Sequence, residues 1–329
     1  MTNSAKVNLT GNEDQPGGHG FTLAVCPLCQ EDKADDPLPV RDWEYGGPGL
    51  FSLARCCNCR LRYLKLRPTP AHMALYYPAY YVSYRTAIED ESWALMRWMR
   101  RRTIVRQRQV VERFSPPNAN RILDIGCSTG IFLAEMKAAG WQTYGVELNR
   151  EAAAYAQRRF GLDVQVGYLS ETSWSPQTFE AVTMWDVLEH TFEPLETLQQ
   201  VYQLLKPGGI VVCIVPNEHS LDRYLFGDAW VGYDAPRHLT VFSPETLERM
   251  VHTTGFQILR LRCGFGGYFS WATSLKIWLH RRQVSPWLRR ALLGLVYLPG
   301  MRLPFEPYFK GLDRLGWGNE LLVVARKPD

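Results

Sequence analysis

The chain has 329 residues, of which 21% are charged and 46% hydrophobic, and its formal net charge is +4 at pH 7. This composition is ordinary for a soluble globular protein, and the net charge is too small to imply a nucleic-acid partner by itself. The length favours one main domain with smaller additions over two full-sized domains.

The first residues, 1–20, are polar and lack both the basic start and the apolar run of a secretory signal peptide, so we expect a disordered tail. The most apolar stretches, "YFSWATSLKIWL" and "ALLGLVYLPG", are shorter than the roughly 20 residues of a membrane-spanning helix. Lys276 also interrupts the first of them. We therefore expect a cytoplasmic protein, with peripheral contact at the inner face of the membrane as an open alternative.

Five of the eight cysteines crowd the N-terminal part, in "CPLC" and "CCNC". Each motif contains a C-x2-C pair that can sit on a tight turn, and two such pairs can direct four thiolates at one tetrahedral Zn²⁺ ion. Cys57 is the fifth cysteine, but its C-x-C spacing to Cys59 suits a metal less well. The predicted zinc ligands are Cys26, Cys29, Cys56 and Cys59.

A four-cysteine site has no open coordination position, so the predicted ion is structural and belongs to a zinc ribbon over residues 21–68. The intervening "EDKADDPLPVRDWEYGG" is rather acidic, which disfavours nucleic-acid binding by this module. Residues 69–118 should form a helical connector that ends in an arginine-rich amphipathic helix. Its arginines are either simply solvated or contact an anionic substrate or a membrane surface.

From residue 119 onward, short apolar runs alternate with helical patterns, which predicts an α/β domain with a doubly wound, mostly parallel sheet over 119–329. Ligands of such folds bind at the carboxyl ends of the strands. The stretch "ILDIGCSTGIF" places a glycine turn at one such end. It lacks the lysine of a P-loop, and Ile131 occupies the third glycine position of a dinucleotide fold.

Two acidic residues flank the glycine turn. Asp124 precedes Gly126 by two residues, and Glu147 follows about 20 residues later, at the end of the next strand. A carboxylate beside the turn would repel a pyrophosphate but suits an ammonium group, and Glu147 is placed to accept hydrogen bonds from ribose hydroxyls. S-adenosylmethionine carries both groups and no phosphate.

At this point the chain resembles the class I S-adenosylmethionine-dependent methyltransferases. The likeness rests on "LDIGCSTG", "GVELN", "FEAVTMWDVLEH" and "LLKPGGIVVCIVPN", which cover residues 121–217 in the expected order. Ser128 replaces the usual middle glycine, and "VGYLSE" lacks the acidic residue that often contacts adenine. The resemblance implies these cofactor-binding residues: Asp124, Gly126, Cys127, Ser128, Gly130, Glu147, Leu148, Leu169 and Trp185.

More narrowly, the four-cysteine module, "PAYY", "WDVLEH" and "APRHLTVFS" resemble a bacterial methyltransferase family whose members modify sugars, lipids or secondary metabolites. The implied acceptor is a small molecule, a glycan or a lipid-linked intermediate, and the expected methylated atom is oxygen. A hydroxyl acceptor usually needs a base, most often histidine. His238 and His190, with Asp186, are the predicted catalytic residues.

The segment "DVLEH" permits a second interpretation. Asp186, Glu189, His190 and His238 could hold a divalent ion, as in the similar E-x-x-E-H arrangement of small-RNA 2'-O-methyltransferases and the E-H pair of ubiquinone-pathway O-methyltransferases. Mixed oxygen and nitrogen ligands suit Mg²⁺ or Mn²⁺, and a bound metal would lower the pKa of an acceptor hydroxyl.

Residues 217–243 are rich in aromatics and long for a connection, so they are predicted to form an acceptor-binding lid. Its candidate acceptor contacts are Trp230, Tyr233 and Arg237. A helical insertion, 264–318, should contain two helices, around 271–282 and 286–298, before a final antiparallel strand. These helices either pack over the sheet or onto the zinc module, or they form an apolar wall for a lipid-linked acceptor at a membrane surface.

Two rival functions remain open. The chain could be a zinc-ribbon adaptor that binds RNA, or an RNA methyltransferase, with the arginine-rich helix as its support. It could also be a noncatalytic assembly partner that binds the cofactor without turnover. The oligomeric state does not follow from the sequence.

Overall fold

The computed structural model describes residues 20–329, apart from 79–80, 82–87, 89–92 and 266. The predicted disordered tail, 1–20, therefore lies outside the described residues except for Gly20, as does the centre of "PAYY". Within the described part of the chain, no helix is both long and apolar enough to span a bilayer.

A seven-stranded sheet forms the centre of the molecule, in the order β12-β13-β10-β9-β6-β7-β8. Its strands pair in parallel except β13, which is antiparallel to both neighbours, so the predicted antiparallel last strand is confirmed. The strands are β6 (Arg121–Ile125), β7 (Gln142–Glu147), β8 (Asp163–Val166), β9 (Phe179–Trp185), β10 (Leu205–Pro216), β12 (Gln257–Cys263) and β13 (Glu320–Arg326).

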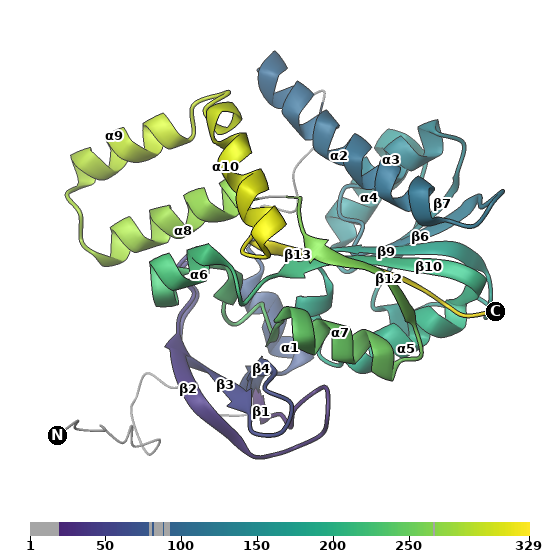
Figure 1. Cartoon of the computed structure of the whole chain (residues 1–329), viewed down its shortest axis with the longest axis horizontal. Helices are drawn as coiled ribbons and strands as arrows, with labels where there is room; N and C mark the ends of the chain where they lie inside the picture. The colour runs from purple at the N-terminus through teal and green to yellow at the C-terminus, as the bar shows by residue number, and fades with distance from the viewer. Residues whose placement is uncertain (1–19, 79–80, 82–87, 89–92, 266) are drawn as a thin grey trace.

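Helices cover both faces of this sheet, which confirms the predicted doubly wound α/β fold (Figure 1). Apolar side chains of β9, β10 and β13 are buried on both sides, as expected for central strands. One face packs against α2 (Ala94–Phe114), α3 (Ile131–Ala138) and α4 (Arg150–Phe160), and the other against α5 (Pro194–Leu204) and α7 (Pro244–Thr253).

The cysteine-containing module completes its own sheet with a strand from the lid. Its strands are β1 (Phe21–Leu23), β2 (Ala34–Val40), β3 (Phe51–Cys56), β4 (Arg62–Leu64) and β5 (Leu66–Pro68), followed by the short α1 (Pro70–Met73). β11 (Thr240–Val241) pairs with β4, giving the order β11-β4-β3-β2. The predicted ribbon and the predicted lid are therefore one structural unit.

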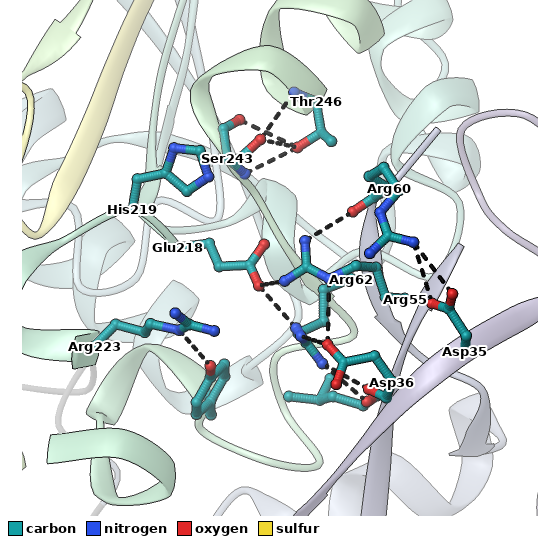
Figure 2. Close-up of polar contacts among 12 residues, drawn as sticks. Asp35, Asp36, Arg55, Arg60, Arg62, Glu218, His219, Arg223, Ser243 and Thr246 are labelled. Carbon is teal, nitrogen blue, oxygen red and sulfur yellow. Dashed lines mark hydrogen bonds and ion pairs between the residues drawn. The ribbon is translucent and has the colours of Figure 1, made fainter. Parts of the chain in front are cut away.

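Buried ion pairs reinforce this unit. The Arg62 side chain donates from Nε to Glu218 at 2.8 Å and from Nη2 to Asp36 at 2.6 Å, and Arg55 also donates to Glu218 (Figure 2). Arg62 and Glu218 are each 2% exposed, so both charges depend on these partners. The network joins β3 and β4 to the start of the lid just after β10.

A second buried ion pair lies deeper in the same interface. The Arg237 guanidinium is fully buried and donates to both carboxylate oxygens of Asp42, at 2.8 and 2.7 Å. It also donates to Asp234 at 2.9 and 2.5 Å and to the Tyr76 carbonyl oxygen at 2.8 Å. Arg237 therefore holds the lid to the cysteine module from the inside.

The insertion contains one more helix than predicted. Within its described residues it forms α8 (Gly267–Arg281), α9 (Pro286–Val296) and α10 (Arg302–Leu315) after the lid helix α6 (Leu221–Phe226). Two prolines near the start of α10 discourage a helix prediction there, but proline is tolerated in a first turn and Pro307 is accommodated within the helix. α9 stands away from the sheet and buries none of its residues (Figure 1).

The buried Arg237–Asp42 pair should contribute strongly to stability. Replacing Asp42 with alanine leaves a buried guanidinium with fewer partners, so we expect the free energy of unfolding to fall by about 3 kcal/mol or more. Urea denaturation would measure this. Asp35→Ala is the control, because Asp35 and Arg60 form an exposed pair worth about 0–1 kcal/mol. Equal losses in the two variants would contradict the assignment.

Candidate functional site

The glycine turn after β6 adopts backbone angles that favour glycine. Gly126, Ser128 and Gly130 all have positive φ, at 70°, 50° and 76°. A Cβ atom on Gly126 would come within 2.6 Å of a Val187 methyl carbon. The turn therefore needs glycine at 126 both for its backbone angle and for close packing against the segment after β9.

Glu147, at the end of β7, ties the turn to the sheet. Its carboxylate accepts hydrogen bonds from the Ser128 and Asn149 backbone amides, each at 2.8 Å. Burial raises the pKa of Glu147, while these backbone bonds act in the opposite direction. Each oxygen retains a lone pair, so the carboxylate can still accept bonds from a ligand.

Asp124 lies beneath the turn rather than beside open solvent. It is 2% exposed and accepts a 2.6 Å hydrogen bond from the Thr183 hydroxyl. Burial raises its pKa to about 8, against the effect of the Thr183 bond, and the nearby Glu147 carboxylate raises it further. A cation bound close to this pair would favour the ionised carboxylate.

A cavity of about 280 Å³ lies over the ends of β6 and β7 and the segment after β8. Four of the nine predicted cofactor residues line it: Gly126, Glu147, Leu148 and Leu169. The others lie around it: Asp124 and Cys127 are buried, Ser128 and Gly130 shape the turn, and Trp185 packs against Phe132. Val187 and His190 line the cavity from the segment after β9.

Three of the four predicted divalent ligands come together. Glu189, His190 and His238 each offer an atom within 4.8 Å of the others. Asp186 is not in this group, although it lines, together with these three residues, a second cavity that is described below. Asp186 has accessible surface, but it lies within a concave part of the protein where desolvation raises its pKa to about 7.

The two histidines are oriented through Nδ1. His190 Nδ1 lies 3.0 Å from the Arg237 carbonyl oxygen, and His238 Nδ1 lies 2.9 Å from that of Gly232. Donation from Nδ1 to a carbonyl leaves Nε2 as the free acceptor on each ring. Burial, together with the neighbouring His238, lowers the pKa of His190 to about 3, and burial also lowers that of His238. Both rings are therefore neutral at pH 7.

Glu189 is fully buried, and neither of its carboxylate oxygens has a hydrogen-bond partner among the described residues. Burial and the Asp186 charge raise its pKa. An unpartnered buried carboxylate is unfavourable unless a ligand satisfies it. Beside two neutral imidazoles, it is well suited to a cation.

A second cavity of about 220 Å³ adjoins this cluster and shares His190 with the first. Of the predicted acceptor contacts, Trp230 lines it, whereas Tyr233 and Arg237 do not. Tyr233 packs against Trp230, and Arg237 is occupied by its carboxylate partners. The structure thus gives these two residues contacts other than those predicted.

Several lining residues escaped sequence analysis. Glu44 and Tyr45 come from the cysteine module and Ser270 from α8, so the cavity is assembled from three parts of the chain. The only sequence signal for the first two is the "WEY" in a segment interpreted as a spacer. Glu44 and Tyr45 are about 80 residues away from the glycine turn in the sequence, so the sequence does not indicate that they lie near the site.

The four predicted cysteine ligands converge. Their sulfur atoms all lie within 4.8 Å of one another, with Cys26 and Cys59 separated by 3.4 Å and Cys29 and Cys56 by 3.5 Å. Cys57 is exposed and outside the cluster, as the spacing argument predicts. A tetrahedral site with Zn–S bonds of about 2.3 Å needs sulfur separations of about 3.8 Å, so a small adjustment would accommodate the ion.

Comparison with known proteins identifies the class. A family model described as "Methyltransferase domain" matches residues 97–261, and the chain belongs to this family. The family match and the relatives together establish it as an S-adenosylmethionine-dependent methyltransferase. The 280 Å³ cavity fits that cofactor, because Glu147 lies at a strand end beside a close-packed glycine turn.

Its relatives include a ubiquinone biosynthesis O-methyltransferase from Vibrio cholerae, 29% identical over 168 residues, which are 46% of this chain and 67% of the relative. The protein of the same name from Aromatoleum aromaticum is 29% identical over 164 residues, covering 46% of this chain and 70% of the relative. A crystal structure of an S-adenosylmethionine-dependent methyltransferase from Archaeoglobus fulgidus is 22% identical and aligns with a TM-score of 0.46, over 69% of this chain and 94% of that one.

The glycine turn and Glu147 generate a binding prediction. Gly126→Val should displace Val187, and Glu147→Ala should release the Ser128 amide, so each should weaken S-adenosylmethionine binding at least tenfold, or by about 1.4 kcal/mol. Isothermal titration calorimetry would measure this. Gly294→Val is the control, because Gly294 lies in α9 with open space around it. Unchanged affinity in both cavity variants would contradict the assignment.

Proposed function

We propose that the protein transfers a methyl group from S-adenosylmethionine to an oxygen atom of a small molecule, glycan or lipid-linked intermediate. The main support is His190, which lines both the cavity of about 280 Å³ over the glycine turn and the cavity of about 220 Å³ beside the histidine cluster. We call the second one the acceptor cavity. The relatives named ubiquinone biosynthesis O-methyltransferase favour a small-molecule acceptor. Nitrogen and carbon are less favoured as methylated atoms.

The polar groups that line the acceptor cavity constrain the acceptor. Five carboxylates and no lysine or arginine occur among its described lining residues: Glu44, Asp186, Glu189, Asp234 and Glu320. Burial raises the pKa values of Asp186, Glu189 and Glu320, so this lining is only partly ionised at pH 7. It nevertheless offers no lysine or arginine partner to a phosphate near the reacting atoms. We therefore favour an acceptor that is neutral where it is methylated, which disfavours an RNA backbone at that point.

The chain has two tasks in this reaction. When bound, the cofactor supplies an electrophilic methyl group, so the protein must align the acceptor and exclude water. Trp230 and the lid enclose the acceptor side. His238 Nε2, free and neutral, then accepts the proton from the acceptor hydroxyl, with His190 as the alternative base.

The cluster of Glu189, His190 and His238 supports a metal-assisted alternative. Two imidazoles and one carboxylate suit Mn²⁺ better than Mg²⁺, which prefers oxygen ligands. A metal there would satisfy the unpartnered Glu189 carboxylate and lower the pKa of an acceptor hydroxyl. A histidine bound to metal through Nε2 cannot also serve as the base, so the two mechanisms are exclusive.

Turnover of histidine and glutamate variants would separate these mechanisms. We expect His238→Ala to reduce methyl transfer at least a hundredfold without changing cofactor affinity, because the acceptor loses either its base or a metal ligand. Transfer of labelled methyl into cell extract would measure it. If a metal is required, Glu189→Gln and a chelator should abolish activity and Mn²⁺ should restore the chelated wild type. Unchanged rates in His238→Ala and His190→Ala would exclude both mechanisms.

We also propose a structural Zn²⁺ at Cys26, Cys29, Cys56 and Cys59. Its support is the convergence of four thiols in a small module that holds the lid through β11. The ion would stabilise the turns at 26–29 and 56–59, next to the start of β2 and the end of β3. These two strands carry the segment with Glu44 and Tyr45 at their other end.

Metal analysis of purified protein should find about one equivalent of zinc. Cys26→Ser or Cys59→Ser should lose it, whereas Cys57→Ser, the matched control, should retain it because Cys57 is exposed and outside the cluster. A fully folded, zinc-free wild type would refute the proposal.

A further inference from the structure

Cationic side chains converge on a cavity that no step of the proposed reaction uses. This arginine cavity, of about 290 Å³, lies between α2, β12 and α10. Only one acidic residue, Asp313, lies among its described lining residues. Its cations are Arg106, Arg113, Arg260, Arg262, Lys310 and Arg314.

The fold brings these cations together from three separate elements. β12 is the edge strand of the sheet, and Arg260 and Arg262 pair with Val324 and Leu322, whose side chains belong to the core beneath α2. The Arg260 guanidinium lies 5.0 Å from the centre of the Phe114 ring at the end of α2. The two arginines of β12 therefore face those of α2 across the cavity.

Most of these cations have no ion-pair partner in the part of the chain that the structure describes; Lys310 is the exception, because it pairs with Glu306 at 3.0 Å. Within the described residues, none of the five arginines forms an ion pair, whereas Arg102 and Arg108 on the same helix pair with glutamates. Burial lowers the pKa of Arg262, and the positive charges of the neighbouring Arg260, Arg106 and Arg113 lower it further. The negative charge of Asp313 acts in the opposite direction. Crowded like charges in a concavity favour a bound anion.

A further cavity lies between the arginine cavity and the acceptor cavity. The arginine cavity shares Arg106, Phe265 and Lys310 with this cavity of about 360 Å³ between α2, α8 and α10. That cavity has Met99, Tyr268 and Phe309 in its walls and shares Asp186 with the acceptor cavity. The three cavities therefore share lining residues in series, with arginines around the first and carboxyl groups around the last.

We propose that the arginine cavity binds a phosphate or diphosphate group of the acceptor, remote from the atom that is methylated. The link to the acceptor rests on the proposed function, but the anion site itself does not. Bidentate guanidinium contacts suit phosphate oxygens, and the cavity has room for one or two such groups rather than a length of nucleic-acid backbone. The acceptor is then a phosphorylated metabolite or a lipid phosphate.

The test is calorimetric titration of the full chain with inorganic pyrophosphate. We expect saturable binding that weakens at least tenfold in Arg262→Gln and in Arg260→Gln. Arg290→Gln is the matched control, because Arg290 is exposed on α9, outside the cavity, and should leave the affinity unchanged. S-adenosylmethionine binding, measured alongside, shows that each variant is folded and distinguishes failure of this site from failure of the proposed function.

Absence of pyrophosphate binding, or an equal loss in Arg290→Gln, would overturn the proposal. Vesicles of phosphatidylcholine with and without phosphatidic acid identify the source of the phosphate. Binding to the acidic vesicles that pyrophosphate displaces indicates a lipid phosphate, for which the uncovered α9 offers an additional contact. Pyrophosphate binding without vesicle binding indicates a soluble acceptor. Tighter, Arg262-dependent binding of an RNA oligomer would replace the proposal with RNA recognition.

Discussion

The buried guanidinium of Arg237 is the contact on which the functional site depends. Its side chain binds Asp42 of the cysteine module and Asp234 of the lid, while its own carbonyl oxygen faces His190 Nδ1 at 3.0 Å. Burial opposes ionisation of Asp234, but the Arg237 charge and hydrogen bonds lower its pKa overall. One residue therefore fixes the lid, the module and the orientation of a candidate catalytic imidazole, with His238 as its immediate neighbour.

This arrangement explains how a common methyltransferase fold acquires its own acceptor site. The central sheet supplies Glu147, the glycine turn and the segment from Asp186 to His190, all at the carboxyl ends of strands. The cysteine module, lid and insertion then enclose the space above these ends. Carboxyl groups gather in the enclosed space near Asp186, and arginines gather beyond Phe265. On the proposed function, the appended elements rather than the sheet would line the acceptor site.

Local patterns predicted the parts of the structure that depend on neighbouring residues. The alternation of strands and helices, the glycine turn with Glu147, and the choice of Cys56 and Cys59 over Cys57 all follow from spacing along short segments. The sequence did not reveal that Arg237 turns inward to Asp42, since an arginine in an aromatic lid looks equally suited to a ligand. The sequence also did not reveal Glu44 and Tyr45, because only the tertiary fold brings them to the site.

The pairing of β11 with β4 has a consequence for synthesis of the chain. More than half of the 329 residues separate Leu64 from Thr240, so the small sheet remains incomplete on the ribosome until the lid has emerged. Contacts so distant in sequence form slowly, since a long loop must close first. During that interval the four thiols lack their final surroundings and are open to oxidation or to the wrong metal. On the proposed zinc assignment, supply of Zn²⁺ to the nascent chain is part of making the enzyme.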